Sequence, residues 1–402
     1  MALIVQKFGG SSVADAAKIK RVAGIIADTY ADDNDVVVVL SAQGDTTDDL
    51  IEKAIEINPK PSKRELDMLL TTGEQISISL CAMALEKMGL PVISLTGWQI
   101  GLKTNSDYGN ARIKSINAER IRRELDKRHI VIVAGFQGIN KYDDVTTLGR
   151  GGSDTTAVAI AVELGADLCQ IYTDVEGVYT ADPRIVPNAR KLDEITYDDM
   201  IELASLGAQV LHNRSVLMAK RYNMNLEVLS SYVRKPGTIV KEVTKMEKLK
   251  ISGVAKDSNI ARIALIGLED EPGKAFKLFK VLERNDINVD IILQSIGRDN
   301  TKDISFTVAK TDLERACEAL EAKRSEVGFD HINIDDNVAK VSIVGAGMLH
   351  TPGIAAKMFE ALYNAKINIH MISSSETKLS VLISGDDATR AVQVIHAKFF
   401  EE

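Results

Sequence analysis

The sequence predicts an α/β protein in which a three-layer αβα sandwich with a mostly parallel sheet is followed by two intertwined βαββαβ units. Up to about residue 230, short β-branched runs alternate with helical patterns, as in parallel sheets covered by helices. A polar, lysine-rich stretch at residues 235–250 then interrupts this alternation, which marks a domain boundary. Beyond it the chain repeats itself after a shift of 80 residues, the signature of duplicated units.

Length and composition indicate a soluble protein of more than one domain. The 402 residues exceed the size at which one hydrophobic core keeps growing. The chain is 45% apolar and 26% charged, and no apolar run approaches the ~20 residues that span a bilayer. Its first residues lack the pattern of a signal peptide. We therefore expect a cytoplasmic protein without a membrane segment.

Charge and cysteine content exclude further classes. With 49 basic and 57 acidic residues the net charge is −8, and without a long basic block we expect no nucleic-acid partner. The cysteines, Cys81, Cys169 and Cys317, are odd in number and far apart, which argues against disulfides and a metal cluster. Buried thiols are the preferred interpretation.

The first domain is built from β-branched strands and capped helices. Its central runs are apolar on both faces, as expected for strands between two helical layers. Ser62 and Glu65 form a capping-box pattern that starts a helix reaching Lys87, where Gly89 and Pro91 follow. The strands are predicted at residues 3–7, 36–41, 92–95, 130–134 and 168–173.

The repeated region predicts two copies of one unit, each reading strand, Pro-Gly turn, helix, strand, strand, helix. The second copy ends soon after its last helix, at about residue 398, so its closing strand must come from elsewhere. Residues 251–255 are the best candidate, which would insert the first copy within the second. The predicted boundaries are 1–245 for the first domain, 246–260 for a linker and the donated strand, and 261–336 and 337–402 for the two copies.

A glycine-rich turn follows the first strand. Lys7, Gly9, Gly10 and Ser11 precede a helix predicted at residues 14–29, and such a turn lets backbone N–H groups and a lysine approach a phosphate. A tight strand-to-helix turn without a ligand is the alternative. The turn is not a Walker A loop, because the lysine precedes the glycines.

A second glycine-rich turn, residues 149–154, opens a helix predicted at 155–164. Arg150 could present its guanidinium fork to a carboxylate, and Ser153 could cap the helix. Asp154 would place negative charge near the helix start, and capping is its alternative role.

A third cluster lies just past a strand, at the edge where doubly wound sheets bind ligands. Here Tyr179 could stack on a base, Asp182 could bind ribose and Arg184 could reach a phosphate. Each of these residues could also be a solvated loop residue.

In order and spacing, these three segments resemble those of aspartate kinases in the amino acid kinase superfamily, over essentially the whole chain. Ser11 stands where many members have Thr, and Asn213 where many have Pro. The resemblance implies catalytic roles for Lys7 and Asp154. It implies contacts to the aspartate substrate from Ser41, Thr47, Glu74, Arg150 and Ser153. It implies ATP contacts from Lys7, Gly9, Gly10, Ser11, Thr173, Asp174, Tyr179, Asp182, Arg184 and Lys191.

The repeated region resembles paired ACT domains, which are ferredoxin-like modules that bind small regulatory molecules. That resemblance implies an amino acid effector, threonine and/or lysine, and a homo-oligomer formed through the ACT domains. Some family members also make this half as a separate subunit, which here would start at Met246. The effector contacts implied are Asp270, Gly273, Asn288, Asp290, Gln294, Ser374, Ser375 and Glu376.

The expected reaction transfers the γ-phosphate of ATP to the β-carboxylate of L-aspartate, giving 4-phospho-L-aspartate, the first step toward lysine, threonine and methionine. The acceptor is already ionised near neutral pH, so no general base is needed. Mg²⁺ is expected to be held through the ATP phosphates, with no metal site made of side chains. A kinase for acetylglutamate, glutamate or a nucleotide, and a non-catalytic amino acid sensor, are the alternatives.

Overall fold

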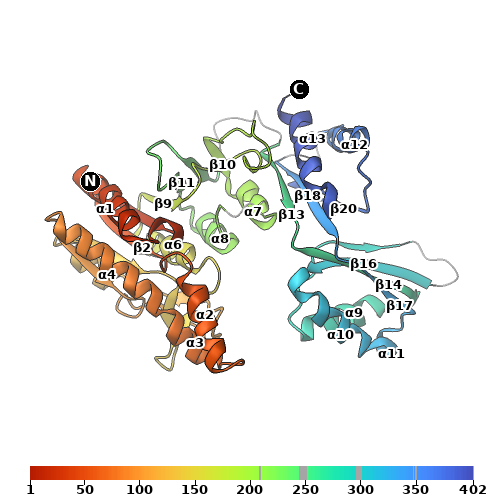
Figure 1. Cartoon of the computed structure of the whole chain (residues 1–402), viewed down its shortest axis with the longest axis horizontal. Helices are drawn as coiled ribbons and strands as arrows, with labels where there is room; N and C mark the ends of the chain where they lie inside the picture. Colours follow the sequence, from red (N-terminus) through yellow and green to blue (C-terminus); the bar gives the residue numbers. More distant parts are fainter. Residues whose placement is uncertain (208–209, 244–250, 296–300, 347, 349–350, 402) are drawn as a thin grey trace. The chain divides into compact units, whose positions relative to one another are not determined.

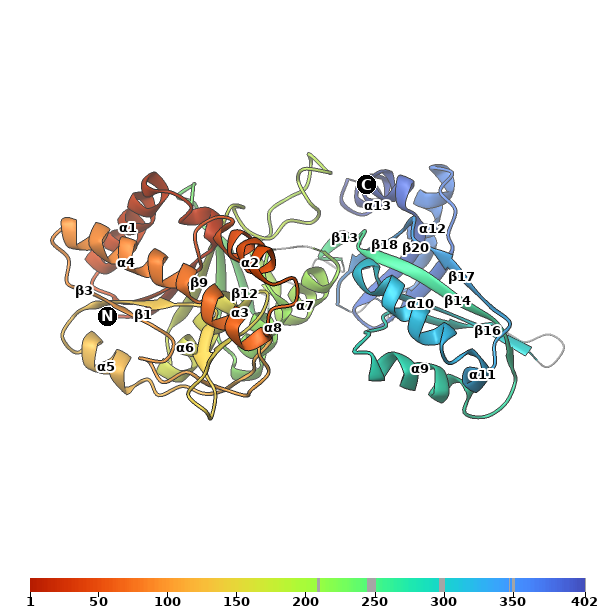
Figure 2. The ribbon, with the colours of Figure 1, turned by 60° about the horizontal axis from the view of Figure 1, so that its bottom comes forward.

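The computed structural model describes all residues except 208–209, 244–250, 296–300, 347, 349–350 and 402. It divides into two compact units, which are described separately (Figures 1 and 2). The first comprises Met1–Tyr179, Lys191–Ala204 and Gln209–Glu247, and the second Thr180–Arg190, Ser205–Ala208 and Lys248–Glu402. The predicted boundary at 245/246, and with it Met246, lies outside the described residues.

An eight-stranded sheet forms the centre of the first unit, in the order β10-β12-β11-β9-β1-β2-β6-β3. All neighbouring strands run parallel except β11 and β12, so the mostly parallel sheet is confirmed. The five predicted strands are present, and β10, β11 and β12 are additional. The bounds are β1 Leu3–Phe8, β2 Asp35–Leu40, β3 Val92–Leu95, β6 Ile130–Ala134, β9 Leu168–Thr173, β10 Glu194–Thr196, β11 Leu226–Ser230 and β12 Thr238–Lys241.

Helices cover both faces of this sheet, which confirms the three layers. On one face, α1 (Ala16–Ala31) and α4 (Thr72–Lys87) pack in one core cluster with Phe8 of β1 and with residues of β2 and β6. Successive side chains of a strand point to opposite faces, and Lys7, next to Phe8, pairs with Asp154 of α6 (Gly152–Leu164). Thus α6, with α8 (Asn213–Tyr222) against it, covers the other face.

The predicted helix from Ser62 to Lys87 is two helices. Ser62 caps α3 (Lys63–Leu70) by accepting a hydrogen bond from Glu65 N, and α4 starts after Thr71. By length and composition alone, residues 63–87 could cross a membrane, but half of the apolar window is buried in the protein. Ile78, Cys81 and Leu85 of α4 belong to the core, as in a core helix of a globular domain.

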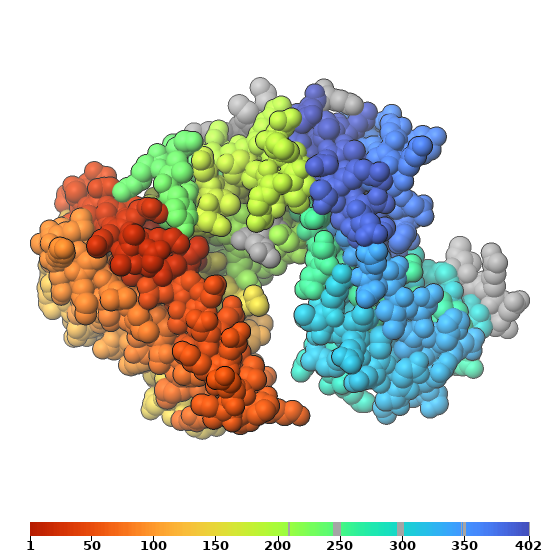
Figure 3. All heavy atoms as spheres, viewed as in Figure 1, coloured from red at the N-terminus to blue at the C-terminus, as the bar shows by residue number. Residues whose placement is uncertain are grey.

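Shorter elements complete the first unit. A small sheet has the order β5-β4-β7-β8, and α2 lies at the surface with no buried residue (orange in Figure 3). The remaining bounds are β4 Lys103–Thr104, β5 Ile113–Ser115, β7 Gln137–Ile139, β8 Val145–Thr147, α2 Thr46–Ile57, α5 Glu119–Leu125 and α7 Tyr197–Ser205.

The second unit contains two four-stranded antiparallel sheets of identical plan, β15-β16-β14-β17 and β19-β20-β18-β13. Strand β13 (Gly253–Asp257) precedes the first copy in sequence but closes the sheet of the second, so the predicted intertwining is confirmed. The other bounds are β14 Ile260–Glu269, α9 Lys274–Arg284, β15 Ile292–Gln294, β16 Thr301–Ala309, α10 Leu313–Glu321, α11 Arg324–Val327, β17 His331–Asp335, β18 Val338–Val344, α12 Ile354–Asn364, β19 Met371–Ser374, β20 Lys378–Ser384 and α13 Ala388–Phe400.

The second unit also includes a segment that the sequence assigns to the first domain. Ala181 and Val186 are buried in the same core cluster as Val392 and Ile395 of α13. A separate five-residue cluster joins the two copies and consists of Ile260, Ile291, Val338, Met371 and Leu382.

Candidate active site

Lys7 and Asp154 form an ion pair at the carboxyl end of β1. Lys7 Nζ lies 2.7 Å from Asp154 Oδ1, and both side chains are nearly buried, at 11% and 12% exposure. Lys7 comes from the strand before the first glycine turn, and Asp154 from the first turn of α6 after the second. The pair therefore joins two segments that sequence analysis singled out independently.

The first glycine turn is held tightly against the loop after β2. Gly10 to Ser12 form a 3-10 turn, and Gly44 N donates to Gly10 O at 3.0 Å. A side chain at Gly10 would have its Cβ 2.8 Å from the carbonyl oxygen of Ala42, so only glycine allows this approach. Ser41 begins that neighbouring loop, and its N–H donates to Phe8 O.

The helix after this turn differs from the prediction. It starts at Ala16 and not at residue 14, and Asp15 caps it by accepting a hydrogen bond from Lys18 N at 2.9 Å. The carboxylate of Asp15 therefore already neutralises the positive potential expected at the start of this helix. Lys7 and the turn itself, with half-buried Gly9 and Gly10 and exposed Ser11, remain as the groups for a phosphate.

Two residues that sequence analysis missed brace the first turn. Ser12 Oγ donates to Ser231 Oγ at 2.8 Å, and Ser231 Oγ donates to Thr173 O at 3.1 Å. Tyr232 Oη donates to Ser11 O at 3.0 Å. They follow the end of β11, a strand that was not predicted, so no local pattern identified them.

Glu74 is a buried carboxylate with one satisfied oxygen. It lies in the first turn of α4, is 2% exposed, and accepts a hydrogen bond from Ala42 N through Oε1 at 3.2 Å. Its other oxygen, Oε2, is buried and has no hydrogen-bond partner in the described part of the chain. Burial raises the pKa of Glu74 to about 7. Such a group is suited to receive a cation, because a buried unpaired oxygen is costly.

The second glycine turn places Arg150 at the surface. Gly149 and Gly151 adopt positive φ angles of +75° and +67°, and Gly151 is the N-cap of α6, without a side-chain capping bond. The predicted capping role of Ser153 is therefore wrong, because Ser153 lies inside the helix and packs against Gly135. Arg150 is exposed, with its guanidinium available to a ligand.

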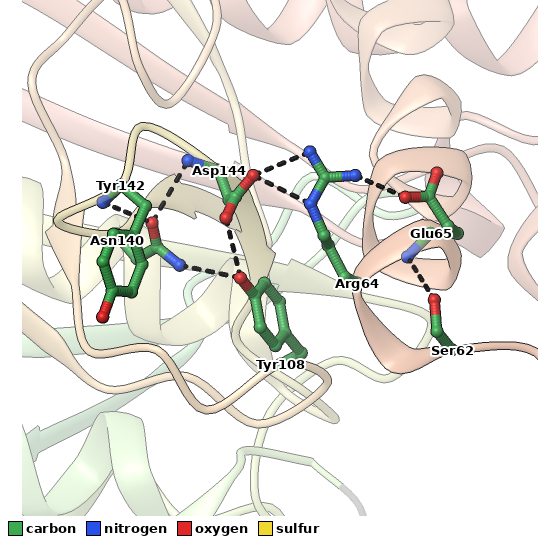
Figure 4. A network of polar contacts seen from close by, with 7 residues as sticks. All are labelled: Ser62, Arg64, Glu65, Tyr108, Asn140, Tyr142 and Asp144. Carbon is green, nitrogen blue, oxygen red and sulfur yellow. Dashed lines mark hydrogen bonds and ion pairs between the residues drawn. The ribbon is translucent and has the colours of Figure 1, made fainter.

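Helix α3 fixes the strand that leads to Arg150. Buried Asp67 accepts hydrogen bonds from Thr147 N, Thr147 Oγ1 and Gly109 N at 2.9, 2.7 and 3.0 Å. At the start of the same helix, Arg64 pairs with Asp144, which also accepts from Tyr108 Oη at 2.8 Å (Figure 4). These contacts connect α3 to both ends of β8.

Arg214 supports the same loop from α8. It donates to Leu148 O and, at 2.9 Å, to Ala111 O. Asn213, which stands where many aspartate kinases have Pro, is the first residue of α8 after the N-cap His212. Proline is favoured at this position of a helix, so Asn213 does not alter the geometry.

Four of the predicted ATP contacts lie at the end of β9 and beyond it in the first unit. Thr173 Oγ1 accepts a hydrogen bond from Val175 N, Asp174 is exposed, and Tyr179 pairs with Lys191 in an isolated bridge. Lys191 Nζ donates to Pro236 O and Gly237 O, which gives this lysine a structural contact as well.

The remaining two, Asp182 and Arg184, lie in the segment that belongs to the second unit. Arg184 donates to both oxygens of Asp182, and the closest contact is 2.8 Å. This pairing lowers the pKa of Asp182. In the structure these two side chains therefore satisfy each other.

The predicted effector residues lie on exposed turns and edge strands of the second unit. In the first copy, Asp270 pairs with Lys302 at 2.6 Å, and Gly273 caps α9 with a φ of +95°. Asp290 pairs with Lys340, a buried residue of β18 in the second copy. The others are exposed, namely Asn288, Gln294, Ser374, Ser375 and Glu376.

The sheet order, the two glycine turns and the duplicated unit define an amino acid kinase with ACT domains. Residues 2–230 match the amino acid kinase family, and residues 263–323 and 341–399 match the ACT domain. The chain is 52% identical to an aspartokinase of Mycolicibacterium smegmatis and 49% identical to one of Bacillus sp., with 99% of this chain and 96% or 97% of the relative covered.

Solved structures agree. The fold matches E. coli aspartokinase III in complex with aspartate and ADP with a TM-score of 0.83 at 27% identity, covering 99% of this chain and 100% of that one. The chain belongs to the aspartokinase family. The expected activity is thereby confirmed as that of an ATP-dependent kinase whose acceptor is the carboxylate of aspartate.

Proposed function

We propose that Lys7, Asp154 and the two glycine turns carry out phosphoryl transfer from ATP to L-aspartate in this chain. The observation that supports this most is the nearly buried Lys7–Asp154 ion pair, which places a cation and an anion where the two turns converge. Gly9, Gly10 and Ser11 would hold the ATP phosphates, with Lys7 countering the charge that develops on the transferring group. Asp154 would hold Lys7 in place until the nucleotide arrives.

One acidic and one basic side chain would recognise the two oppositely charged groups of aspartate. The unpartnered Oε2 of Glu74 would receive the substrate ammonium group, and exposed Arg150 would clamp a carboxylate. Ser41, Thr47 and Ser153 would complete the pocket with hydroxyl donors. This arrangement suits an amino acid, since it pairs one acid and one base with a zwitterion.

ATP would be held at the end of β9 by Thr173, Asp174 and Tyr179, with Asp182, Arg184 and Lys191 reaching the ribose and phosphates. Mg²⁺ would be bound through the phosphates and would neutralise part of their charge. No general base is required, because the acceptor carboxylate is ionised near neutral pH. Positioning of two anions in line is therefore the chief task of the chain.

Regulation would come from an amino acid effector, threonine and/or lysine, bound at the ACT copies. E. coli aspartokinase III has been solved with lysine and aspartate, which supports an effector of this kind. Asp270, Gly273, Asn288, Asp290 and Gln294 would bind it in the first copy. Ser374, Ser375 and Glu376 would contribute from the second.

We also propose a cytoplasmic homo-oligomer that associates through the ACT sheets. The edge strands β15 and β19 expose Ile292 and Ile372 at equivalent places of the two copies, at 53% and 48% exposure. Exposed apolar residues on open edges favour pairing with another chain. A separate regulatory subunit from Met246 remains a prediction, tested by expressing the intact gene and looking for a second product.

A hydroxamate assay with the purified protein tests the proposal. The acyl phosphate formed from aspartate should be trapped by hydroxylamine, whereas glutamate and acetylglutamate should give only background signal. Turnover with acetylglutamate in place of aspartate would favour a related kinase. Absence of product with all three acceptors, together with tight threonine or lysine binding, would favour a non-catalytic sensor.

A further inference from the structure

One segment of the proposed ATP site is built into the regulatory half of the chain. Thr180–Arg190 carries Asp182 and Arg184 and belongs to the second unit. Its neighbours Tyr179 and Lys191 belong to the first unit and pair with each other. The segment is thus an eleven-residue loop, and the bridge between Tyr179 and Lys191 closes it.

Apolar contacts anchor this loop in the core of the second ACT copy. Ala181 and Val186 are 4% and 5% exposed and belong to the core cluster that contains Val392 and Ile395 of α13. Ile185 and Ala189 pack against the same cluster. Two side chains inside the core and two packed against it hold the segment to the second ACT copy.

Hydrogen bonds from the backbone and from side chains fix the segment at its start, middle and end. At its start, Val254 N of β13 donates to Thr180 O at 2.8 Å. In the middle, Gln393 Nε2 donates to Ile185 O at 2.9 Å, and at the end Arg190 Nη2 donates to Phe400 O at 3.0 Å. Two of these three contacts come from α13.

The third contact from α13 is fully buried. His396 Nε2 lies 2.9 Å from Thr180 Oγ1, with side chains at 0% and 2% exposure. Thr180 Oγ1 also accepts a hydrogen bond from Arg190 N at 3.0 Å, so one hydroxyl joins both ends of the segment to the helix. His396 Nδ1 is buried without a hydrogen bond in the described residues. Nδ1 lies 4.0 Å from Glu401 Oε1, too far for a hydrogen bond. The bond to Thr180 is therefore the close polar contact of the histidine.

We propose that α13 positions the nucleotide-binding segment, with His396 as the positioning residue, so that the C-terminal helix of the regulatory half sets the affinity for ATP. This inference rests on the proposed assignment of Asp182 and Arg184 to the nucleotide. A segment ordered before ATP arrives spares the nucleotide the entropic cost of ordering it. Loosening the segment raises the KM for ATP and leaves the KM for aspartate unchanged, because Glu74 and Arg150 lie on other elements.

The test uses the full-length protein and steady-state kinetics with each substrate varied in turn. His396→Phe keeps the stacking on Phe400 but removes the hydrogen bond, and Thr180→Val removes the same bond from the other side. His396→Gln can restore a donor near the position of Nε2. Arg390→Ala is the matched control, because Arg390 lies on α13 and, among the described residues, forms its ion pair with Asp387 three residues away.

We expect His396→Phe and Thr180→Val to raise the KM for ATP roughly 3- to 10-fold, the range that corresponds to one buried hydrogen bond. His396→Gln should recover part of the loss, and Arg390→Ala should match the parent. Amide hydrogen exchange over residues 180–190 should accelerate in the first two variants only. That local readout identifies loosening even where one variant folds poorly.

Arg184→Ala separates this inference from the proposed function. If it raises the KM for ATP while His396→Phe and Thr180→Val leave it unchanged, the positioning role is wrong and the nucleotide assignment stands. If His396→Phe and Thr180→Val raise the KM for ATP and both Arg184→Ala and Asp182→Ala do not, the assignment of Asp182 and Arg184 to the nucleotide is wrong, and only the support of the segment by α13 stands. Unchanged KM values in all four variants refute both.

Discussion

At the scale of single residues, the site depends on buried charges whose partners are few. Lys7 and Asp154 neutralise each other in a nearly buried position, and Glu74 keeps one oxygen without a hydrogen-bond partner among the residues that the structure describes. Their types were predictable from the resemblance of the glycine turns to a known family. Their burial was not, because it arises from α4 and α6 packing on opposite faces of the sheet.

Lys7→Ala and Asp154→Ala should each lower kcat by about 10²- to 10³-fold, because Lys7 counters the charge that develops on the transferring phosphoryl group and Asp154 holds Lys7 in position. The KM for aspartate should change less. Circular dichroism checks folding. The control is Thr29→Ser on α1, because a serine hydroxyl can still accept the hydrogen bond from Gln6, the neighbour of Lys7 on β1. Near-normal turnover in either alanine variant would contradict the assignment.

Glu74 should make aspartate binding depend on pH. Its pKa is raised to about 7 by burial, so the carboxylate that receives the ammonium is lost as pH falls through 7. The KM for aspartate should then rise about tenfold per pH unit below 7, with little change in the KM for ATP. Glu74→Gln should have a high KM that no longer varies between pH 6 and 8.

The same shift predicts a stability effect of opposite sense. The contribution of Glu74 to folding is fully present below its unfolded pKa of about 4.5 and is lost as pH rises through 7. Glu74→Gln should therefore unfold at a higher temperature than the parent at pH 8 and lose that advantage near pH 5. A lower melting temperature at pH 8 would mean that the carboxylate is better satisfied than the structure indicates.

At the scale of elements, the sequence patterns predicted the continuous buried strands but not the features that depend on contacts between distant parts of the chain. The continuous apolar run of β2 predicts a central strand and forms one. Strand β11 was missed because its burial alternates. The break at Thr71 was missed because Gly73 lies inside the first turn of α4 and does not mark the end of α3. There, the carbonyl of Thr71 accepts from Gln137 Nε2, a contact 66 residues away that no local pattern reveals.

Helix α3 holds the loop that carries Arg150. Asp67 accepts two hydrogen bonds from Thr147 and one from Gly109 N. Arg150 follows Thr147 on the same loop. Asp67→Asn offers one acceptor oxygen in place of two and removes the negative charge, so at least one of the three hydrogen bonds is lost or must reverse its direction. We expect the KM for aspartate to rise several-fold with the KM for ATP unchanged.

A matched control for that experiment is Arg64→Ala, which removes the outer contact of α3 to Asp144 at the surface. Exposed pairs contribute roughly 0–1 kcal/mol, so its effect on aspartate should be smaller than that of Asp67→Asn. Equal effects of the two variants would show that α3 acts by overall stability and not by holding the loop.

At the scale of the whole molecule, the duplicated half is where sequence and structure agree most closely. The second copy lacks a closing strand in sequence, and β13 supplies it from before the first copy. The assignment of Thr180–Arg190 to the second unit was not predictable, since the partners of this segment on α13 lie more than 200 residues away. Regulation therefore has two physical routes, through the interlocked copies and through that segment.

The last prediction separates recognition of the effector from structural support at Asp290. Asp290 pairs with buried Lys340 across the two copies. If Asp290 binds the ammonium group of the effector, Asp290→Asn should weaken inhibition about 5- to 150-fold, the usual range of allosteric coupling. Lys340→Met frees Asp290 and should preserve or strengthen inhibition. If Asp290 serves only to hold Lys340, both variants should weaken inhibition alike. Dose–response curves with threonine and with lysine distinguish these outcomes, because a ligand shifts the kinase only through a difference in affinity for its two states.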